Sequence, residues 1–167
     1  MLVVVALFTG CRTVGPPRTW VSTGVHYVSE QGEIDDFLDD SAGFSVGVGT
    51  YLPVRRVGVG PELEGIFSSN DTTFDSGYVT VSRFLAGVRV GYFPNAPFVP
   101  YLRGGYMGRW DDGRSIDESG SGFYVGGGVN LFVAPFVSFA PQVLYTSSNL
   151  SVEAEEIIAG LNVDFHF

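Results

Sequence analysis

This 167-residue sequence contains no lysine and a single cysteine, Cys11. One cysteine excludes an internal disulfide. No apolar run approaches the roughly 20 residues that a transmembrane helix needs. Charged residues make up only 16% of the chain, which is below the usual quarter. The net charge of −9 argues against nucleic acid as a partner.

The chain is nevertheless hydrophobic, with 45% apolar residues and 14% aromatic residues. Hydrophobicity without a helical span favours burial in a membrane through strands. The last eleven residues show the pattern best, because apolar side chains occupy every second position: Ile157, Ala159, Leu161, Val163, Phe165 and Phe167. The positions between them include Asn162, Asp164 and His166. This alternation predicts a strand with one apolar and one polar face.

Similar segments recur along the chain and predict an all-β fold. We expect eight strands near residues 19–29, 43–52, 56–67, 77–92, 98–110, 121–133, 136–146 and 155–167. No helical periodicity separates them, so we predict an antiparallel up-and-down meander rather than βαβ units.

The predicted connections alternate in length, as in transmembrane barrels with short periplasmic turns and long external loops. The long connections are 30–42, 68–76, 111–120 and 147–154, and the short ones are 53–55, 94–97 and 134–135. An even number of strands then leaves both termini on the periplasmic side. The long connections are acidic, and we expect them to form a negatively charged outer end that could meet an extracellular ligand: Glu30, Glu33, Asp35, Asp36, Asp39, Asp40, Asp71, Asp75, Asp111, Asp112, Asp117, Glu118 and Glu153.

The strands divide into two faces. The predicted lipid face is apolar and carries aromatic residues such as Tyr92, Phe98, Trp110, Tyr145 and Phe167 near strand ends, as an interfacial girdle requires. The opposite face carries charges of both signs and many glycines. Because the interior of an eight-stranded barrel is filled by side chains and buried charges need partners, we predict an internal network in which Arg83, Arg89 and Arg103 meet Glu62, Glu64 and other acids. Its predicted members are Glu62, Glu64, Arg83, Arg89, Arg103, Arg109, Gln142, Glu156 and Asp164, and the same face includes Arg56, Asn130, Asn162 and His166.

Two features fit the strand pattern poorly. Pro61, Pro100 and Pro141 fall inside predicted strands, where each removes a ladder hydrogen bond. Val79 and Val81 share the face of Arg83, so the fourth strand either extends beyond the membrane or contains a bulge. We expect register irregularities at these positions.

The N-terminal residues 1–10 are apolar and end in small residues before Cys11. They resemble the end of a bacterial signal peptide, although no basic residue precedes them, which a late start position would explain. Cys11 is the predicted lipidation site, and an ordinary secretory signal is the alternative. We therefore divide the chain into a signal-like segment (1–10), a linker (11–18) and one barrel domain (19–167).

Three segments resemble the last strands of the OmpA-like and opacity-type outer-membrane β-barrel family: Pro100–Tyr106, Gly122–Val129 and Gly160–Phe167. The resemblance implies an eight-stranded transmembrane barrel in the outer membrane of a two-membrane bacterium, a monomer in contact with membrane lipids. It also implies a structural role or a role in adhesion, envelope integrity or defence, and few members are enzymes. In this family, a terminal strand such as Leu161, Val163, Phe165 and Phe167 is recognised by the barrel-assembly machinery.

The sequence offers little for catalysis or cofactors. His26 with Ser22 on the same face is the only hint of a Ser–His pair, and we expect no enzyme activity and no cofactor. The acidic segment Asp35–Asp40 lacks the ordered spacing of a calcium loop. One alternative is a lipocalin-like soluble carrier, in which apolar residues would line a cavity for a small apolar ligand. The other is a narrow pore through the barrel.

Overall fold

The computed structural model describes residues 19–31, 40–71, 78–93, 97–113, 117–150 and 153–167, and all regular structure in them is β-strand. The signal-like segment, the linker and the lipidation site Cys11, all predicted within residues 1–18, lie outside these ranges. Among these residues there is no helical segment that could span a membrane. The strands are β1 (Thr19–Gln31), β2 (Ser41–Thr50), β3 (Leu52–Val54), β4 (Val57–Asp71), β5 (Tyr78–Tyr92), β6 (Phe98–Gly113), β7 (Asp117–Ala134), β8 (Val137–Asn149) and β9 (Glu153–His166).

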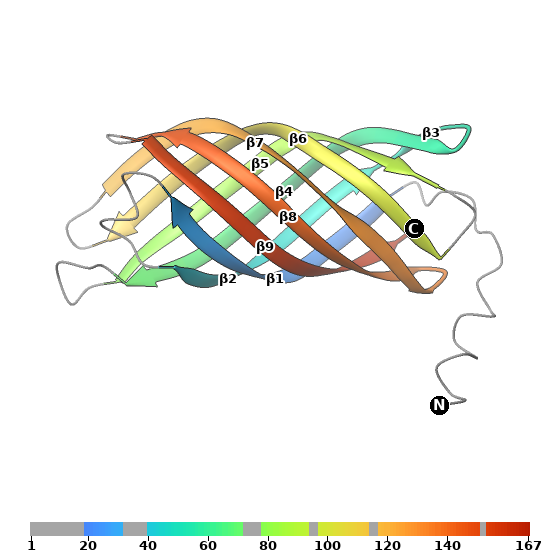
Figure 1. The fold of residues 1–167 in the computed structure, drawn as a ribbon, viewed down its shortest axis with the longest axis horizontal. Coiled ribbons are helices and arrows are strands. Elements are labelled where there is room, and N and C mark those ends of the chain that lie inside the picture. The colour runs from blue at the N-terminus through green and yellow to red at the C-terminus, as the bar shows by residue number, and fades with distance from the viewer. Residues whose placement is uncertain (1–18, 32–39, 72–77, 94–96, 114–116, 151–152) are drawn as a thin grey trace, which may run out of the picture.

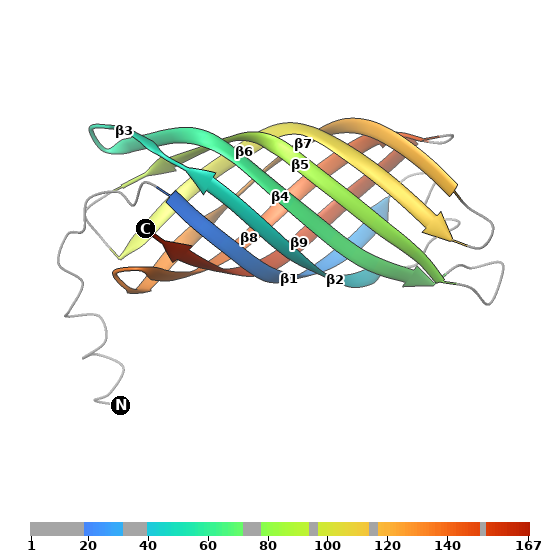
Figure 2. The same ribbon diagram turned by 180° about the vertical axis from the view of Figure 1, so that it is seen from behind.

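The strands close into a barrel (Figures 1 and 2). Neighbours in the chain pair antiparallel, β1 pairs with β9, and β2 pairs with β4. The short β3 continues β2 along the same edge of β4, so β2 and β3 together form one strand of the barrel that is interrupted at the buried Tyr51. The predicted eight-stranded antiparallel up-and-down barrel is therefore confirmed.

The barrel has two distinct ends. We call one the turn end, because the β3–β4 and β7–β8 turns lie there together with the start of β1 and the C-terminus (Figure 1). Thr19 and Phe167 are joined there by backbone hydrogen bonds of 3.4 and 2.9 Å. The opposite end, where β1 connects to β2 and β4 to β5, is called the loop end. Both ends of the barrel domain thus lie at the turn end.

Several predicted boundaries were wrong, chiefly at the loop end. The segments 111–120 and 147–154 are mostly strand, because β6 and β7 pair as far as Asp112 and Asp117, and β8 and β9 as far as Asn149 and Glu153. A strand in a closed sheet continues as long as its neighbour offers backbone hydrogen bonds, even where its side chains become polar.

The first short turn was also misplaced. It falls at Arg55, whose φ of 59° is left-handed, and at Arg56 rather than at 53–55. Arg56 is exposed in this turn, so its predicted place on the interior face is wrong.

The expected irregularities at the prolines are limited to one side of the strand: the pairing of β4 with β2 and β3 is interrupted around Pro61, and that of β8 with β7 around Pro141, without a change of register there. The registers of β4, β6 and β8 with at least one neighbour run unbroken through Pro61, Pro100 and Pro141. The shift that the described pairings do contain lies between Phe132 and Ala134 of β7. β5 has no bulge, so its Val79 and Val81 are explained by extension of the strand.

The two faces of the barrel differ as predicted. Exposed large side chains on the outer wall are apolar or aromatic on every long strand, for example Val25, Leu102, Phe123 and Phe165. On β9 the alternate residues Asn162, Asp164 and His166 are buried inside. A wall of this kind is stable only when lipid or detergent covers it.

Candidate functional site

The interior is the most elaborate part of the barrel, and it contains two separate polar networks. The network nearer the turn end is centred on Glu62. Arg103 Nε donates to Glu62 at 2.6 Å, Arg89 Nε donates to it at 2.7 Å, and the Tyr124 hydroxyl donates to it at 3.0 Å. Arg103 also donates to Glu64 at 2.5 Å. We call this group, with Gln142, Asn162 and Asp164, the turn-end network.

Arg89 is held by rings as well as by carboxylates. Its guanidinium carbon lies 4.6 Å from the Trp20 ring centroid and 4.3 Å from the Tyr101 ring centroid. Its Nη1 lies 3.5 Å from Asp164. A guanidinium between two aromatic faces gains cation–π attraction that strengthens away from water.

The second network lies nearer the loop end and centres on Glu156. Arg83 Nε donates to both Glu156 oxygens at 2.9 and 2.8 Å, and Arg109 Nη1 donates at 2.5 Å. Arg109 also forms a two-pronged pair with Asp111 at 2.8 and 2.9 Å. Glu30 accepts longer hydrogen bonds of 3.3 Å from each arginine. We call this group the loop-end network.

An apolar layer separates the two networks. It consists of Val28, Ile66, Leu85, Met107, Tyr124, Leu144 and Ile158, which are almost fully buried and pack together. On β1 the order is His26, Val28, Glu30, and on β8 it is Gln142, Leu144, Thr146, so each strand passes from one network through the layer to the other.

All predicted network residues are inside the barrel, and Arg89 and Arg103 pair with Glu62 and Glu64, whereas the connections of Arg83 differ from those predicted. The sequence predicts that Arg83, like Arg89 and Arg103, meets Glu62, Glu64 and other acids. The apolar layer prevents this, and Arg83 pairs with Glu156 and Glu30 instead.

Sequence reasoning missed Glu30 and Asp111, which it placed in external loops. Both are buried, at 1% and 3% exposure, and both pair with arginine. The sequence did contain this information. Glu30 is an even number of residues from His26 on β1, as Asp111 is from Arg109 on β6, so each acid faces the same side of its strand as that interior residue. Following the alternation past the apolar band would have found them.

The suspected Ser–His pair is also inside. Ser22 and His26 are buried, and His26 Nε2 lies 2.7 Å from the hydroxyl of Ser45 and 3.9 Å from Glu64. These contacts join His26 to the turn-end network rather than to the lipid-facing wall. Among the described residues, no group of three or more His, Cys, Asp or Glu side chains could hold a metal ion.

Glycine makes room for the larger interior side chains. A Cβ at Gly49 would lie 2.1 Å from the Trp20 ring, and one at Gly160 would lie 2.1 Å from His26 Nδ1. Glycine at these positions therefore allows Trp20 and His26 to turn inward.

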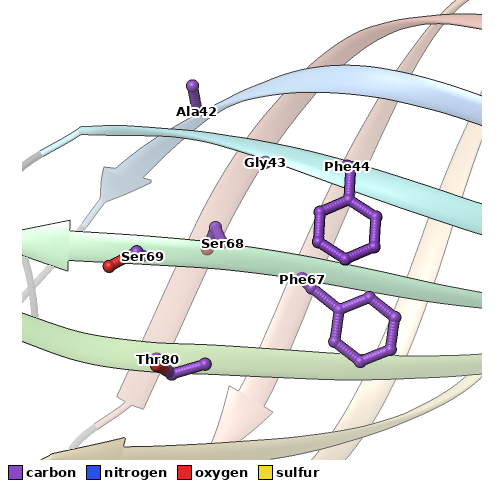
Figure 3. Close-up of a pocket in the computed structure, with 7 residues that line it drawn as sticks. All are labelled: Ala42, Gly43, Phe44, Phe67, Ser68, Ser69 and Thr80. Atoms are coloured by element: carbon purple, nitrogen blue, oxygen red, sulfur yellow. The ribbon is translucent and has the colours of Figure 1, made fainter.

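The outer wall has a shallow depression near the loop end, with a volume of about 430 Å³. It lies over β2, β4 and β5, where the stacked rings of Phe44 and Phe67 border small residues (Figure 3). The lining is Ala42, Gly43, Phe44, Phe67, Ser68, Ser69 and Thr80. The depression lies on the outside of the barrel, on the apolar wall.

Just outside the strands at the loop end, Asp40 accepts a hydrogen bond of 2.5 Å from the Tyr27 hydroxyl. This bond lowers the pKa of the Asp40 carboxyl. Five of the other predicted loop acids, Glu33, Asp35, Asp36, Asp39 and Asp75, fall in residues 32–39 and 72–77, which lie outside the described residues.

A family model for the outer membrane protein beta-barrel domain matches residues 12–165. No curated protein matches the chain.

Solved structures share the fold at low identity. Neisserial surface protein A has a TM-score of 0.65 at 13% identity, over 89% of this chain and 97% of that one. Ail, the attachment invasion locus protein of Yersinia pestis, solved in complex with the heparin analogue sucrose octasulfate, has a TM-score of 0.59 at 15% identity, over 89% and 99%. OprG from Pseudomonas aeruginosa has a TM-score of 0.57 at 11% identity, over 90% and 97%.

Proposed function

This chain belongs to the outer membrane protein beta-barrel family, and from that premise we propose that it is a sealed, monomeric barrel with a structural or surface-interaction role. The observation that carries the proposal is the filled interior. Two ion-pair networks and an apolar layer occupy the space that a channel would need. What such a barrel can offer to other molecules is its loop end.

We further propose that the loop end faces the outside and that both barrel termini face the periplasm. The acids in segments 32–40 and 72–77 would then be extracellular, while Arg55 and Arg56 at the turn end would be periplasmic. The outward Leu161, Val163, Phe165 and Phe167 of the last strand would be read by the barrel-assembly machinery. Membrane lipids would cover the apolar wall.

The charge of the loop end favours a cationic partner. Ail was solved with a polyanionic heparin analogue, whereas the segment from 32 to 40 in this chain carries five acids and no basic residue: Glu33, Asp35, Asp36, Asp39 and Asp40. Like charges would repel a polyanion at this surface. A basic peptide or a basic protein surface would be attracted, and the attraction would weaken with added salt.

The two alternatives from the sequence, a lipocalin-like carrier and a narrow pore, agree less well with the barrel interior. A lipocalin-like carrier needs an apolar interior, but the arginines and acids face inward and the apolar side chains outward. A narrow pore needs a continuous polar path, and the apolar layer interrupts it.

A cellular assay separates the structural role from the surface role. A deletion strain would be complemented with the natural chain, with a loop variant (Asp35→Asn, Asp36→Asn, Asp39→Asn, Asp40→Asn), or with a turn-end control (Arg55→Ser, Arg56→Ser). We expect both variants to restore resistance to detergent, and only the loop variant to lose binding to a polylysine-coated surface. Equal binding by all three proteins would contradict a surface role for these acids.

A further inference from the structure

Buried polar atoms that have no hydrogen-bond partner among the described residues are concentrated in the turn-end half of the interior. They include Arg89 Nη1, Arg103 Nη2, Asn130 Oδ1, Gln142 Nε2, Asn162 Oδ1 and Asp164 Oδ1. Every one of these side chains is at most 4% exposed. Leaving a buried polar group unsatisfied costs about 1–3 kcal/mol, so several in one region require an explanation.

The loop-end network is different. Its guanidinium and carboxylate groups are matched to one another, to Thr146, and to Asn70 and Ser68 of β4. Within the described part of the loop-end half, the unsatisfied buried atoms are two hydroxyls, those of Ser41 and Ser148. The two halves of the same interior therefore differ sharply in how completely their polar atoms are satisfied.

The chemistry of the unsatisfied atoms identifies what would satisfy them. Arg89, Arg103 and Gln142 offer N–H donors, whereas Asn130, Asn162 and Asp164 offer oxygen acceptors. A cation would be repelled by the first set and an anion by the second. Water both donates and accepts, and buried waters typically make about three hydrogen bonds to such groups.

We propose that the turn-end network binds a cluster of ordered water molecules, and that the apolar layer ends this hydrated region and leaves the loop-end network dry. The barrel interior would then be a blind, half-hydrated compartment. This inference is independent of the loop partner, because it rests only on interior residues.

The arginine side chains provide the test. The full chain, labelled with ¹⁵N-arginine and refolded in deuterated detergent micelles, would be studied by NMR for cross-relaxation between water and guanidinium protons. Contacts with the rings of Trp20, Tyr101 and Tyr124 assign Arg89 and Arg103 without any substitution. We expect water cross-peaks at Arg89 and Arg103, and none at Arg83 and Arg109. Cross-peaks at all four arginines, or at none, would overturn the proposal.

A variant of the apolar layer tests the barrier itself. Leu144 lies between Gln142 and Thr146 on β8 and is fully buried. Leu144→Ser should let water cross-peaks appear at Arg83 and Arg109, whereas the lipid-facing control Leu102→Ser should not. A folded Leu144→Ser variant without water cross-peaks at Arg83 and Arg109 would contradict the role of the layer. If that variant does not fold, the cross-peaks of the unsubstituted chain still test the hydration of the turn-end network.

Discussion

Arg83 on β5 and Glu156 on β9 form a two-pronged ion pair across the barrel interior. Arg83 Nε reaches both carboxylate oxygens at 2.9 and 2.8 Å, although β6, β7 and β8 separate the two strands in the sheet. Such a pair ties opposite walls together, and both side chains are fully removed from solvent. Removing one member leaves a charge buried without its main partner.

Arg83→Met should therefore destabilise the barrel by about 3–5 kcal/mol, because Glu156 and Glu30 would lose a guanidinium. The exposed turn residue Arg55 provides the control, and Arg55→Met should change stability by less than about 0.5 kcal/mol. Urea unfolding of the micelle-bound protein measures both. Similar losses in the two variants would argue against the network as a stabilising element.

The two glutamates of the loop-end network should respond unequally to neutralisation. This network holds three carboxylates, those of Glu30, Asp111 and Glu156, against two guanidiniums. Glu30 accepts the long hydrogen bonds, whereas Glu156 accepts the short ones. Glu30→Gln should cost about 1 kcal/mol or less, and Glu156→Gln should cost about 3–5 kcal/mol. The same unfolding assay would contradict this ranking if Glu30→Gln were the more damaging change.

Adjacent glycines on β6 should tolerate alanine very differently. A Cβ at Gly105 would lie 2.3 Å from the Ala86 carbonyl oxygen and 2.5 Å from Gly87 Cα, both backbone atoms of β5. At Gly104 the nearest atom would be 3.2 Å away. We expect Gly105→Ala to cost about 1–3 kcal/mol through overpacking and Gly104→Ala to cost less. Comparable unfolding midpoints for the two variants would show that the strands can separate without penalty.

A charge on the lipid face should destabilise according to its depth. Val125 is exposed in the middle of β7, and Leu52 is exposed on the short β3 at the turn end. Val125→Arg should cost about 2–4 kcal/mol in a bilayer, and Leu52→Arg about 0–1 kcal/mol. Folding measured in lipid vesicles tests this, and equal effects at the two depths would contradict a membrane-embedded wall.

The Tyr27–Asp40 hydrogen bond gives a prediction about pH. This bond lowers the pKa of Asp40 in the folded protein. A lowered folded pKa stabilises the fold above the unfolded pKa, and the contribution disappears as pH falls through the folded value. Tyr27→Phe should therefore raise the Asp40 titration midpoint and remove this contribution. Carbon-detected NMR titration of the Asp40 carboxyl measures the shift, and an unchanged midpoint would rule out the bond.

The fold was accessible from the sequence because period-two alternation is a direct consequence of strand geometry. The last strand shows this clearly, since Phe165 faces outward and Asp164 inward as their parity requires. The C-terminal boundary of β6 was not accessible, because pairing with β7 continues through polar residues such as Asp112. Side-chain type predicts environment, whereas backbone pairing decides where a strand stops.

Which residues face the interior was largely predictable, but which of these residues pair with one another was not. Strand alternation places Arg83 and Glu62 on the same face, but it does not show at which level along the barrel axis each side chain lies. Those levels depend on the register around the whole closed sheet, in which Arg83 lies opposite Ile66 and Arg109. The apolar layer also results from this register. It could not be predicted from residues such as Ile158, because a buried isoleucine is ordinary in any core.

The most direct test of a membrane-embedded barrel is the gel mobility of the full chain, boiled and unboiled, after refolding with and without detergent micelles. The apolar outer wall predicts a compact species that forms only with detergent and shifts in mobility on boiling. A compact monomer that forms in plain buffer would contradict the account, because the exposed apolar wall could not then face water.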